Sequence, residues 1–180
     1  MKKTVLTFGL ISGFIMIGMM TLSLAFSERI GFGHSLVLGY TILIAGSLLV
    51  FFGIRSYREN VGGGQISFGR AFAVGILITL VASVCYVVTW EIVYFKFMPD
   101  FCDKYAAYAI EQARAAGESA QKIQAIADEM KSMKATLDNP LLNAAFSFIE
   151  PFPIGLIVTL ISAAILRKKP RQPVNEAVAA

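Results

Sequence analysis

The sequence predicts an all-α integral membrane protein, with four transmembrane helices and an extracytoplasmic helical hairpin between the third and the fourth. Three observations lead to this prediction. Of the 180 residues, 56% are apolar and only 16% are charged, whereas a soluble domain carries about 25% charged residues. Four long runs of the chain are almost free of charge, and basic residues flank these runs. Such a composition excludes a disordered chain, a collagen-like chain and a disulfide-rich secreted scaffold.

The first apolar run, residues 5–26, contains 22 residues without a charge. As a helix it is about 33 Å long, which is enough to cross a hydrocarbon core of about 30 Å. The apolar part of a signal peptide is only about 7 to 15 residues long, so we expect this run to be retained as a span. The other spans are expected at 35–54, 71–98 and 141–166.

Residues 99–140 are expected to form the hairpin outside the membrane. Pro99 breaks or bends the third span, and the following segment, 104–116, is rich in strong helix formers. Gly117 is a predicted helix stop and Ser119 a predicted cap of the second arm. Apolar residues then recur at helical spacing over 123–137, and we expect this stripe to pack on the first arm. A partner-binding or dimerising face is the alternative.

The fourth run contains two prolines directly after an acidic residue. Pro151 and Pro153 follow Glu150, and a proline forces a helix to start, bend or break. A span that began at Pro151 and ended at Leu166 would be about 24 Å long, which is short. We therefore expect one kinked, continuous helix. The alternative is a separate interfacial or re-entrant helix over 141–149.

The positions of the basic residues predict the orientation of the chain. The N-terminus, the 55–70 loop and the C-terminal tail hold nine of the sixteen Lys and Arg residues, whereas 99–140 holds five basic and seven acidic residues. The positive-inside rule therefore predicts that both termini are cytoplasmic. We expect one membrane domain, 1–170, followed by a flexible cytoplasmic tail, 171–180. Basic residues that flank spans are not a phosphate-tracking stripe, so nucleic acid is excluded as a partner.

Small residues recur at helical intervals within the spans, which lets helix backbones approach closely. An internal four-helix bundle explains these stripes, although homodimerisation through the first two glycines remains open. The glycines predicted to pack helices are Gly9, Gly13, Gly39, Gly46, Gly53, Gly75 and Gly155.

Glu91 and Glu150 are the candidate functional residues, because ionisable side chains within a membrane are costly and are by default functional hypotheses. Both are expected in the outer half of the membrane or at its outer interface, on consecutive antiparallel helices. Lys96, Arg29 and His34 are their candidate partners. The alternative is that the two glutamates are hydrated at the headgroup boundary or paired with Lys96.

No residue set predicts an enzyme, a metal centre or a cofactor site. His34 is the only histidine, so neither a zinc site nor a Ser-His-Asp triad has the residues that it needs. Cys85 and Cys102 are about 26 Å apart if the chain between them is helical, which is too far for a disulfide. Cys102 is interpreted as a free thiol or as a link to another chain.

Three segments carry a family resemblance: GIRSYREN (53–60), SVCYVVTWEIVYFKFMPDF (83–101) and NPLLNAAFSFIEPFPIGLIVTLISAAILRKK (139–169). With these segments the chain resembles the Domain of Unknown Function 4199 family, small multi-pass membrane proteins known mainly from bacteria of the Bacteroidetes type. The resemblance extends over residues 1–169. It implies residence in the bacterial inner membrane, and it supplies no activity.

The leading functional hypothesis is therefore a non-enzymatic binding, scaffold or accessory protein of the membrane. Its outer hairpin would meet a partner, which is a lipid or another membrane protein, or the protein would form a homo-oligomer. The alternative is a small transporter or channel subunit that uses Glu91 and Glu150 in a proton or cation path.

Overall fold

The computed structural model describes residues 1–30 and 32–168, with the exception of the side chains of 24–30, 32, 33, 35 and 36. This part of the chain is helical and contains no β-strand, which confirms the predicted all-α fold class. In chain order the elements are α1 (Lys2–Ile30), α2 (Phe32–Asn60), α3 (Phe68–Ile92), the π-helical turn η1 (Val93–Phe97), α4 (Phe101–Ala115), α5 (Ala120–Leu137), α6 (Pro140–Ile149) and α7 (Pro151–Leu166). The predicted tail, 171–180, lies outside the described residues.

Within the described part of the chain, four segments are long and apolar enough to cross a membrane, which confirms the predicted number of spans. They are Lys2–Ser23, Val37–Asn60, Phe68–Phe97 and Pro140–Leu166. The helices extend beyond the uncharged runs, because the charged residues at their ends also favour a helix. In α2, for example, Arg55 and Glu59 form an ion pair of 2.9 Å one helical turn apart.

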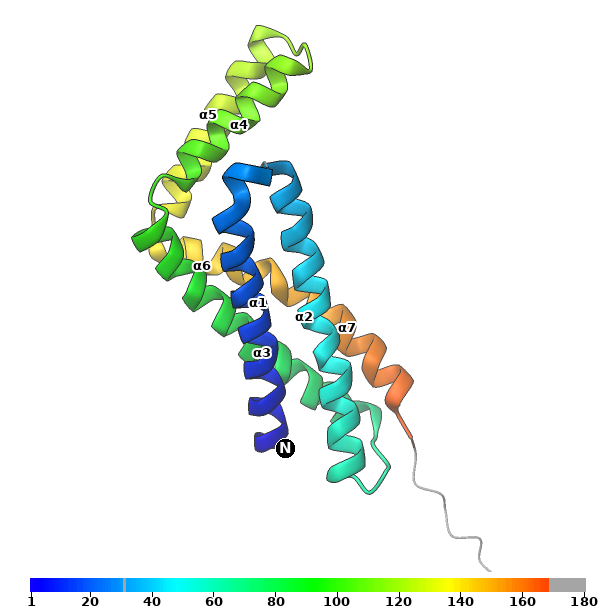
Figure 1. Cartoon of the computed structure of the whole chain (residues 1–180). Coiled ribbons are helices and arrows are strands. Elements are labelled where there is room, and N and C mark those ends of the chain that lie inside the picture. The colour runs from blue at the N-terminus through cyan, green and yellow to red at the C-terminus, as the bar shows by residue number, and fades with distance from the viewer. Residues whose placement is uncertain (31, 169–180) are drawn as a thin grey trace, which may run out of the picture.

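The four apolar segments form one bundle, and the α4–α5 hairpin projects from one end of it (Figure 1). In the bundle, α1 packs against α2 and α3, while α7 packs against α3 and α2. Two groups of buried side chains form the core. One surrounds Ile54, Val74 and Ile78, and the other surrounds Met16, Leu43 and Tyr86, nearer to the hairpin.

The predicted glycine positions mark where these helices approach most closely. A Cβ atom on Gly75 would lie 2.7 Å from Thr159 Cγ2, and one on Gly155 would clash with Thr79. The hydroxyls of Thr79 and Thr159 lie 3.2 Å apart and form a hydrogen bond between α3 and α7. The other close contacts pair Gly9 with Val81, Gly13 with Cys85, Gly46 with Met16 and Gly53 with Ile78. Gly39 is the exception, because a Cβ there would meet nothing within 4 Å.

The end of the bundle opposite the hairpin is closed by the α2–α3 loop. This loop turns at Gly63 and Gly64, whose φ angles of 58° and 82° suit glycine. Its Ile66 exchanges two backbone hydrogen bonds with Lys168, at 3.2 and 2.9 Å. Arg58 donates to the carbonyl of Leu166, 3.4 Å away, at the C-terminus of α7. The N-terminus, the α2–α3 loop and the end of α7 therefore share one end of the molecule (Figure 1).

The hairpin follows the expected plan. Helix α3 passes into η1, and the chain then leaves it around Pro99, where the predicted break lies. Gly117, with φ of 73°, lies between α4 and α5, and the Ser119 hydroxyl accepts from the Lys122 amide at 3.3 Å. The two arms contact each other, and the apolar stripe of α5 is half-buried. The stripe thus packs on the first arm, as predicted.

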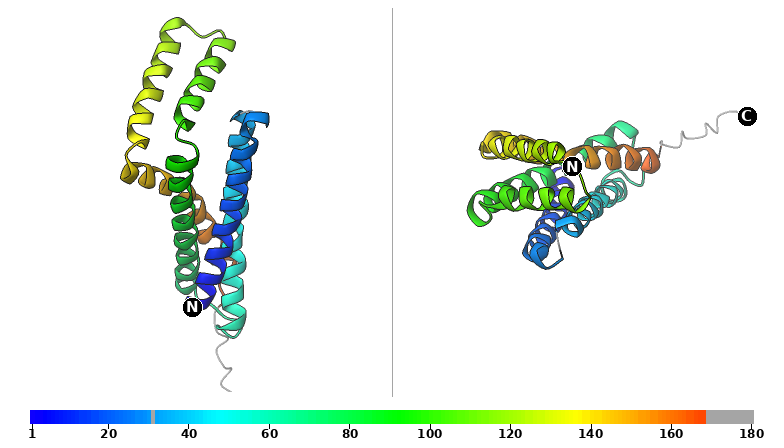
Figure 2. Two further views of the ribbon diagram at one scale, coloured as in Figure 1. Left: turned by 60° about the vertical axis from the view of Figure 1, so that its left-hand side comes forward. Right: turned by 90° about the horizontal axis from the view of Figure 1, so that it is seen from above.

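The fourth apolar run differs from the kinked, continuous helix that we preferred. It consists of two helices, α6 and α7, which meet at Glu150 at a clear angle, and α6 lies crosswise to the bundle helices, in contact with α3 (Figure 2). Pro151 and Pro153 lie in the first turn of α7. A proline in the first turn removes no intrahelical hydrogen bond, so the two residues start a new helix and need not distort an existing one.

Candidate functional site

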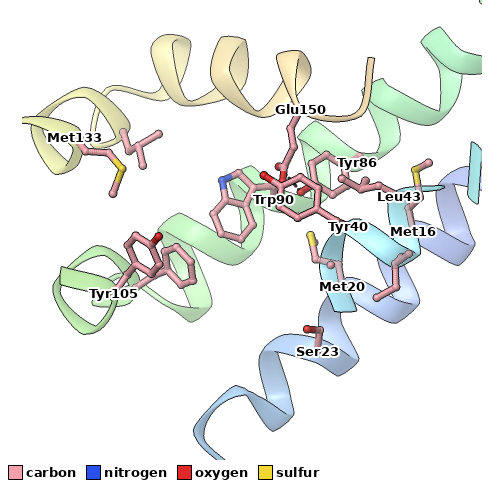
Figure 3. A pocket seen from close by; sticks show the side chains of 14 residues that line it. Met16, Met20, Ser23, Tyr40, Leu43, Tyr86, Trp90, Tyr105, Met133 and Glu150 are labelled. Atoms are coloured by element: carbon pink, nitrogen blue, oxygen red, sulfur yellow. Dashed lines mark hydrogen bonds between the residues drawn. The ribbon is translucent and has the colours of Figure 1, made fainter. Parts of the chain in front are cut away.

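A pocket of about 260 Å³ lies where the bundle, the hairpin and the α6–α7 junction meet (Figure 3). Every α-helix except α6 and α7 contributes to its lining, and the junction between those two contributes Glu150. Five aromatic side chains and three methionines dominate the lining. The complete set is Met16, Met20, Ser23, Gly39, Tyr40, Ile42, Leu43, Tyr86, Trp90, Phe101, Tyr105, Met133, Leu137 and Glu150.

Helix α3 supplies the aromatic side chains at the centre of the site. Tyr86 and Trp90 of α3 and Tyr94 of the adjoining turn η1 recur every four residues, so they lie along one side of this helical segment. Tyr86 and Trp90 line the pocket. Tyr94 is buried one turn further on, where its hydroxyl donates to Asp138 Oδ1 at 3.0 Å and lies 3.3 Å from Cys102 Sγ. This side of α3 and η1 therefore connects the pocket wall to the base of the hairpin.

Glu150 is the one acidic residue of the lining. It is exposed to the pocket and points from the α6–α7 junction toward the rings of Tyr86 and Tyr40 (Figure 3). The Tyr86 hydroxyl donates to Glu150 Oε2 at 2.8 Å. The residue lies directly before α7, whose first and third residues are prolines without a backbone N–H, so the described donor that holds the carboxylate is the hydroxyl of Tyr86. A carboxylate is thus held in place at the edge of an otherwise apolar cavity.

Asn143 of α6 positions the indole of Trp90. The side chain of Asn143 is fully buried, and its Oδ1 accepts from Trp90 Nε1 at 3.0 Å and from the Ser147 hydroxyl at 3.1 Å. Its Nδ2 donates to the Leu137 carbonyl at 2.9 Å. These bonds join α3, the end of α5 and α6, and they fix the orientation of the indole ring.

Glu91 and Lys96 do not belong to this site. Glu91 is half-buried on α3 next to Trp90 in sequence, but it does not line the pocket, and its Oε1 is buried without a hydrogen-bond partner among the described residues. Lys96 and His34 are exposed. The side chain of Arg29, the other candidate partner, lies outside the described ones. The structure thus brings only Glu150, of the two predicted glutamates, to the pocket.

The model of the family described as "Protein of unknown function (DUF4199)" matches residues 7–168. The chain belongs to the DUF4199 family. The match confirms the resemblance carried by the three segments quoted above. Comparisons with curated proteins and with solved structures gave no match.

Several important residues of this DUF4199 chain were missed by the sequence analysis. Tyr40, Tyr86 and Trp90 lie in apolar runs, where aromatic residues are expected as ordinary core or lipid-facing side chains. Asn143 carried a usable signal, because an amide in an apolar run must find hydrogen-bond partners when it is buried. That signal identifies a polar contact in advance, but not the indole that makes it.

Cys102 is placed differently from the link to another chain that we considered. It is free and only 2% exposed, and its Sγ lies against the Tyr94 hydroxyl. A thiol in this position is not presented to a second molecule. Its contacts indicate a structural role at the base of the hairpin of this DUF4199 protein.

Proposed function

We propose that this protein is a non-enzymatic binding protein of the bacterial inner membrane, which holds a small amphiphilic ligand in the pocket. The observation that carries the proposal is the lining itself: aromatic and methionine side chains from five helices around one carboxylate. Ligand sites are typically concave and mostly apolar, with a few placed polar groups. A pocket between spans and hairpin also suits a ligand that enters from the bilayer.

The shape of the site supports an accessory role. Phe101, Tyr105, Met133 and Leu137 come from the hairpin, whereas most of the remaining lining comes from the spans. A bound ligand would therefore contact both parts and favour one orientation of the hairpin relative to the bundle. The hairpin could in this way present a ligand-dependent surface to a partner in the membrane.

The geometry favours binding over the transporter alternative. A proton or cation path through Glu91 and Glu150 requires both side chains along one connected cavity. Glu150 lines the pocket and Glu91 does not. The pocket therefore supports a ligand site more directly than a path that joins the two glutamates.

Trp90 allows a direct test of the proposed site, because it is the only tryptophan of the chain and lies in the pocket. Single-chain amphiphiles with brominated tails and different head groups would be titrated into the purified protein in nanodiscs. We expect saturable quenching of Trp90 fluorescence by at least one of them. A Trp90→Phe variant supplies the background signal.

A pair of glycine variants tests whether the quenching comes from the pocket. Gly39→Leu places a side chain in the lining, whereas Gly18→Leu adds the same side chain at an exposed position where a Cβ meets nothing within 4 Å. We expect Gly39→Leu to weaken quenching and Gly18→Leu to leave it unchanged. If no amphiphile quenches saturably, or if both variants behave alike, the proposed function is wrong.

A further inference from the structure

We infer that the pocket selects an amphiphile with a single positively charged head, an alkylammonium or related organic cation. This inference rests on the proposed function and names its ligand class. It is carried by the juxtaposition of the Glu150 carboxylate with the rings of Tyr86, Tyr40 and Trp90 in one lining (Figure 3).

The charge of the lining favours a cation. Among the fourteen lining residues Glu150 is the only acidic one, and none is Lys, Arg or His. Tyr86 donates to Oε2, and no described hydrogen bond involves Oε1. An ammonium group at this oxygen would offset the cost of keeping a carboxylate at the edge of an apolar cavity.

The aromatic rings favour an organic cation over a metal ion. Cations that carry alkyl groups are recognised over the faces of Trp and Tyr rings, with Trp the best of them. The bond from Trp90 Nε1 to Asn143 holds the indole by its edge. Phe101 packs against the same indole in an edge contact, with ring centroids 5.2 Å apart. The soft thioethers of Met16, Met20 and Met133 adapt to an alkyl chain.

The same features disfavour the other head groups of membrane amphiphiles. A phosphate or carboxylate head would be repelled by Glu150, because the lining contains no cationic side chain that compensates the negative charge of the head group. A zwitterionic lipid would bring such a phosphate beside its ammonium. The cavity volume of about 260 Å³ lies just below the usual range for ligand sites, which suits a single-chain amphiphile better than a two-chain lipid.

The experiment uses the Trp90 fluorescence assay with three probes that share one brominated twelve-carbon tail. Their heads are trimethylammonium, hydroxyl and carboxylate, and a brominated phosphatidylethanolamine serves as the zwitterionic lipid. We expect the trimethylammonium probe to bind at least about tenfold more tightly than the others.

Glu150→Gln should weaken binding of the trimethylammonium probe by about tenfold and leave the hydroxyl probe unchanged. The amide keeps an oxygen that accepts from Tyr86, so the variant removes the charge and preserves the shape. Glu91→Gln is the matched control, because it removes the same charge from a neighbouring residue outside the lining. We expect it to have no effect on either probe.

The possible results separate this inference from the proposed function. If the hydroxyl, carboxylate or phosphatidylethanolamine probe binds as tightly as the cation, and Gly39→Leu weakens that binding, the site stands and the choice of a cation is wrong. The choice is also wrong if Glu150→Gln and Glu91→Gln have equal effects. If none of the probes quenches Trp90 fluorescence saturably, both the choice of a cation and the proposed function are wrong.

Discussion

At the scale of single residues, the site depends on polar side chains that are held by other polar side chains. Tyr86 positions Glu150, and Asn143 positions Trp90. Each pair joins α3 to the segment after α5, so the hydrogen bonds both orient the pocket wall and connect helices. Within apolar surroundings a lost partner leaves a buried donor or acceptor unsatisfied, which costs more than the hydrogen bond itself contributes.

Replacement of Asn143 by alanine should therefore destabilise the protein by about 1–3 kcal/mol. The change removes three hydrogen bonds and leaves the Trp90 N–H without its acceptor. Thermal unfolding in detergent would measure the loss, and the Trp90 emission maximum should shift. Asn60→Ala is the control, since Asn60 is exposed and its described side-chain hydrogen bonds both go to Ser56. Equal midpoints for the two variants would contradict the role assigned to Asn143.

The ion pair between Lys134 and Asp103 joins the two arms of the hairpin, at 2.7 and 2.5 Å to the two carboxylate oxygens. The hydrogen bond from Lys134 to Asp103 raises the pKa of the Lys134 ammonium above its ordinary value of 10.5. A raised pKa means that the stabilisation is fully present below pH 10.5 and is lost as the pH rises through the folded-state value. Because the pair is exposed, its effect is small and sensitive to salt.

We expect the wild type to unfold at a higher temperature than Lys134→Met. This difference in unfolding midpoint should stay constant around neutral pH and become smaller above pH 10.5. Circular dichroism melts at low salt would record it. Lys131→Met is the control, because Lys131 is exposed on the same helix and makes no described ion pair with the first arm. A gap that widens at high pH would show that the pair does not act in this way.

At the scale of elements, contact between small residues decides how α3 and α7 associate. Apolar side chains gain nothing by leaving lipid, so close backbone approach and packing hold the helices together. Gly75 and Gly155 face the two threonines that bond to each other. Gly9 and Gly13 face Val81 and Cys85 of the same chain, so in this structure they allow close packing within the bundle.

Gly155→Leu should accordingly destabilise the bundle by roughly 1–3 kcal/mol, because the new side chain meets Thr79 on a packed face. Gly18→Leu, at an open position, should leave stability nearly unchanged. Thermal unfolding of the two variants in the same detergent makes the comparison. If Gly155→Leu melted with the wild type, the close contact between α3 and α7 would not contribute to stability.

At the scale of the whole molecule, the α2–α3 loop and the hairpin lie at opposite ends (Figure 1). The α2–α3 loop and the end of α7 are joined by the Ile66–Lys168 backbone pair, so they lie on one side. The pocket lies toward the other end, where hairpin and spans meet. This arrangement suits the predicted orientation, in which the hairpin is outside the membrane.

Labelling of intact cells with a membrane-impermeant maleimide tests this orientation. Ala125→Cys lies on an exposed position of the hairpin, and Gln65→Cys lies on an exposed position of the α2–α3 loop. We expect the first variant to be labelled in intact cells and the second only after lysis. The wild type reports the background from Cys85 and Cys102. The reverse labelling pattern would show that the chain has the opposite orientation in the membrane.

The properties that follow from local pattern could be predicted from the sequence alone. The length of each apolar run determined the four spans, because a bilayer of given thickness requires a helix of given length. Gly117 and Ser119 marked the hairpin, and six of the seven glycines predicted to pack helices lie at close contacts. These features depend on residues near one another along the chain.

Only the tertiary structure decided which distant residues meet. It separated Glu91 from Glu150, buried Cys102, and turned Pro151 into the start of a new helix. The rotation of each helix about its axis and the angle at Glu150 determine the pocket. Small differences in packing energy set both quantities, and helical periodicity does not encode them. The sequence by itself therefore determined the membrane-spanning architecture, and the packing of the helices created the site.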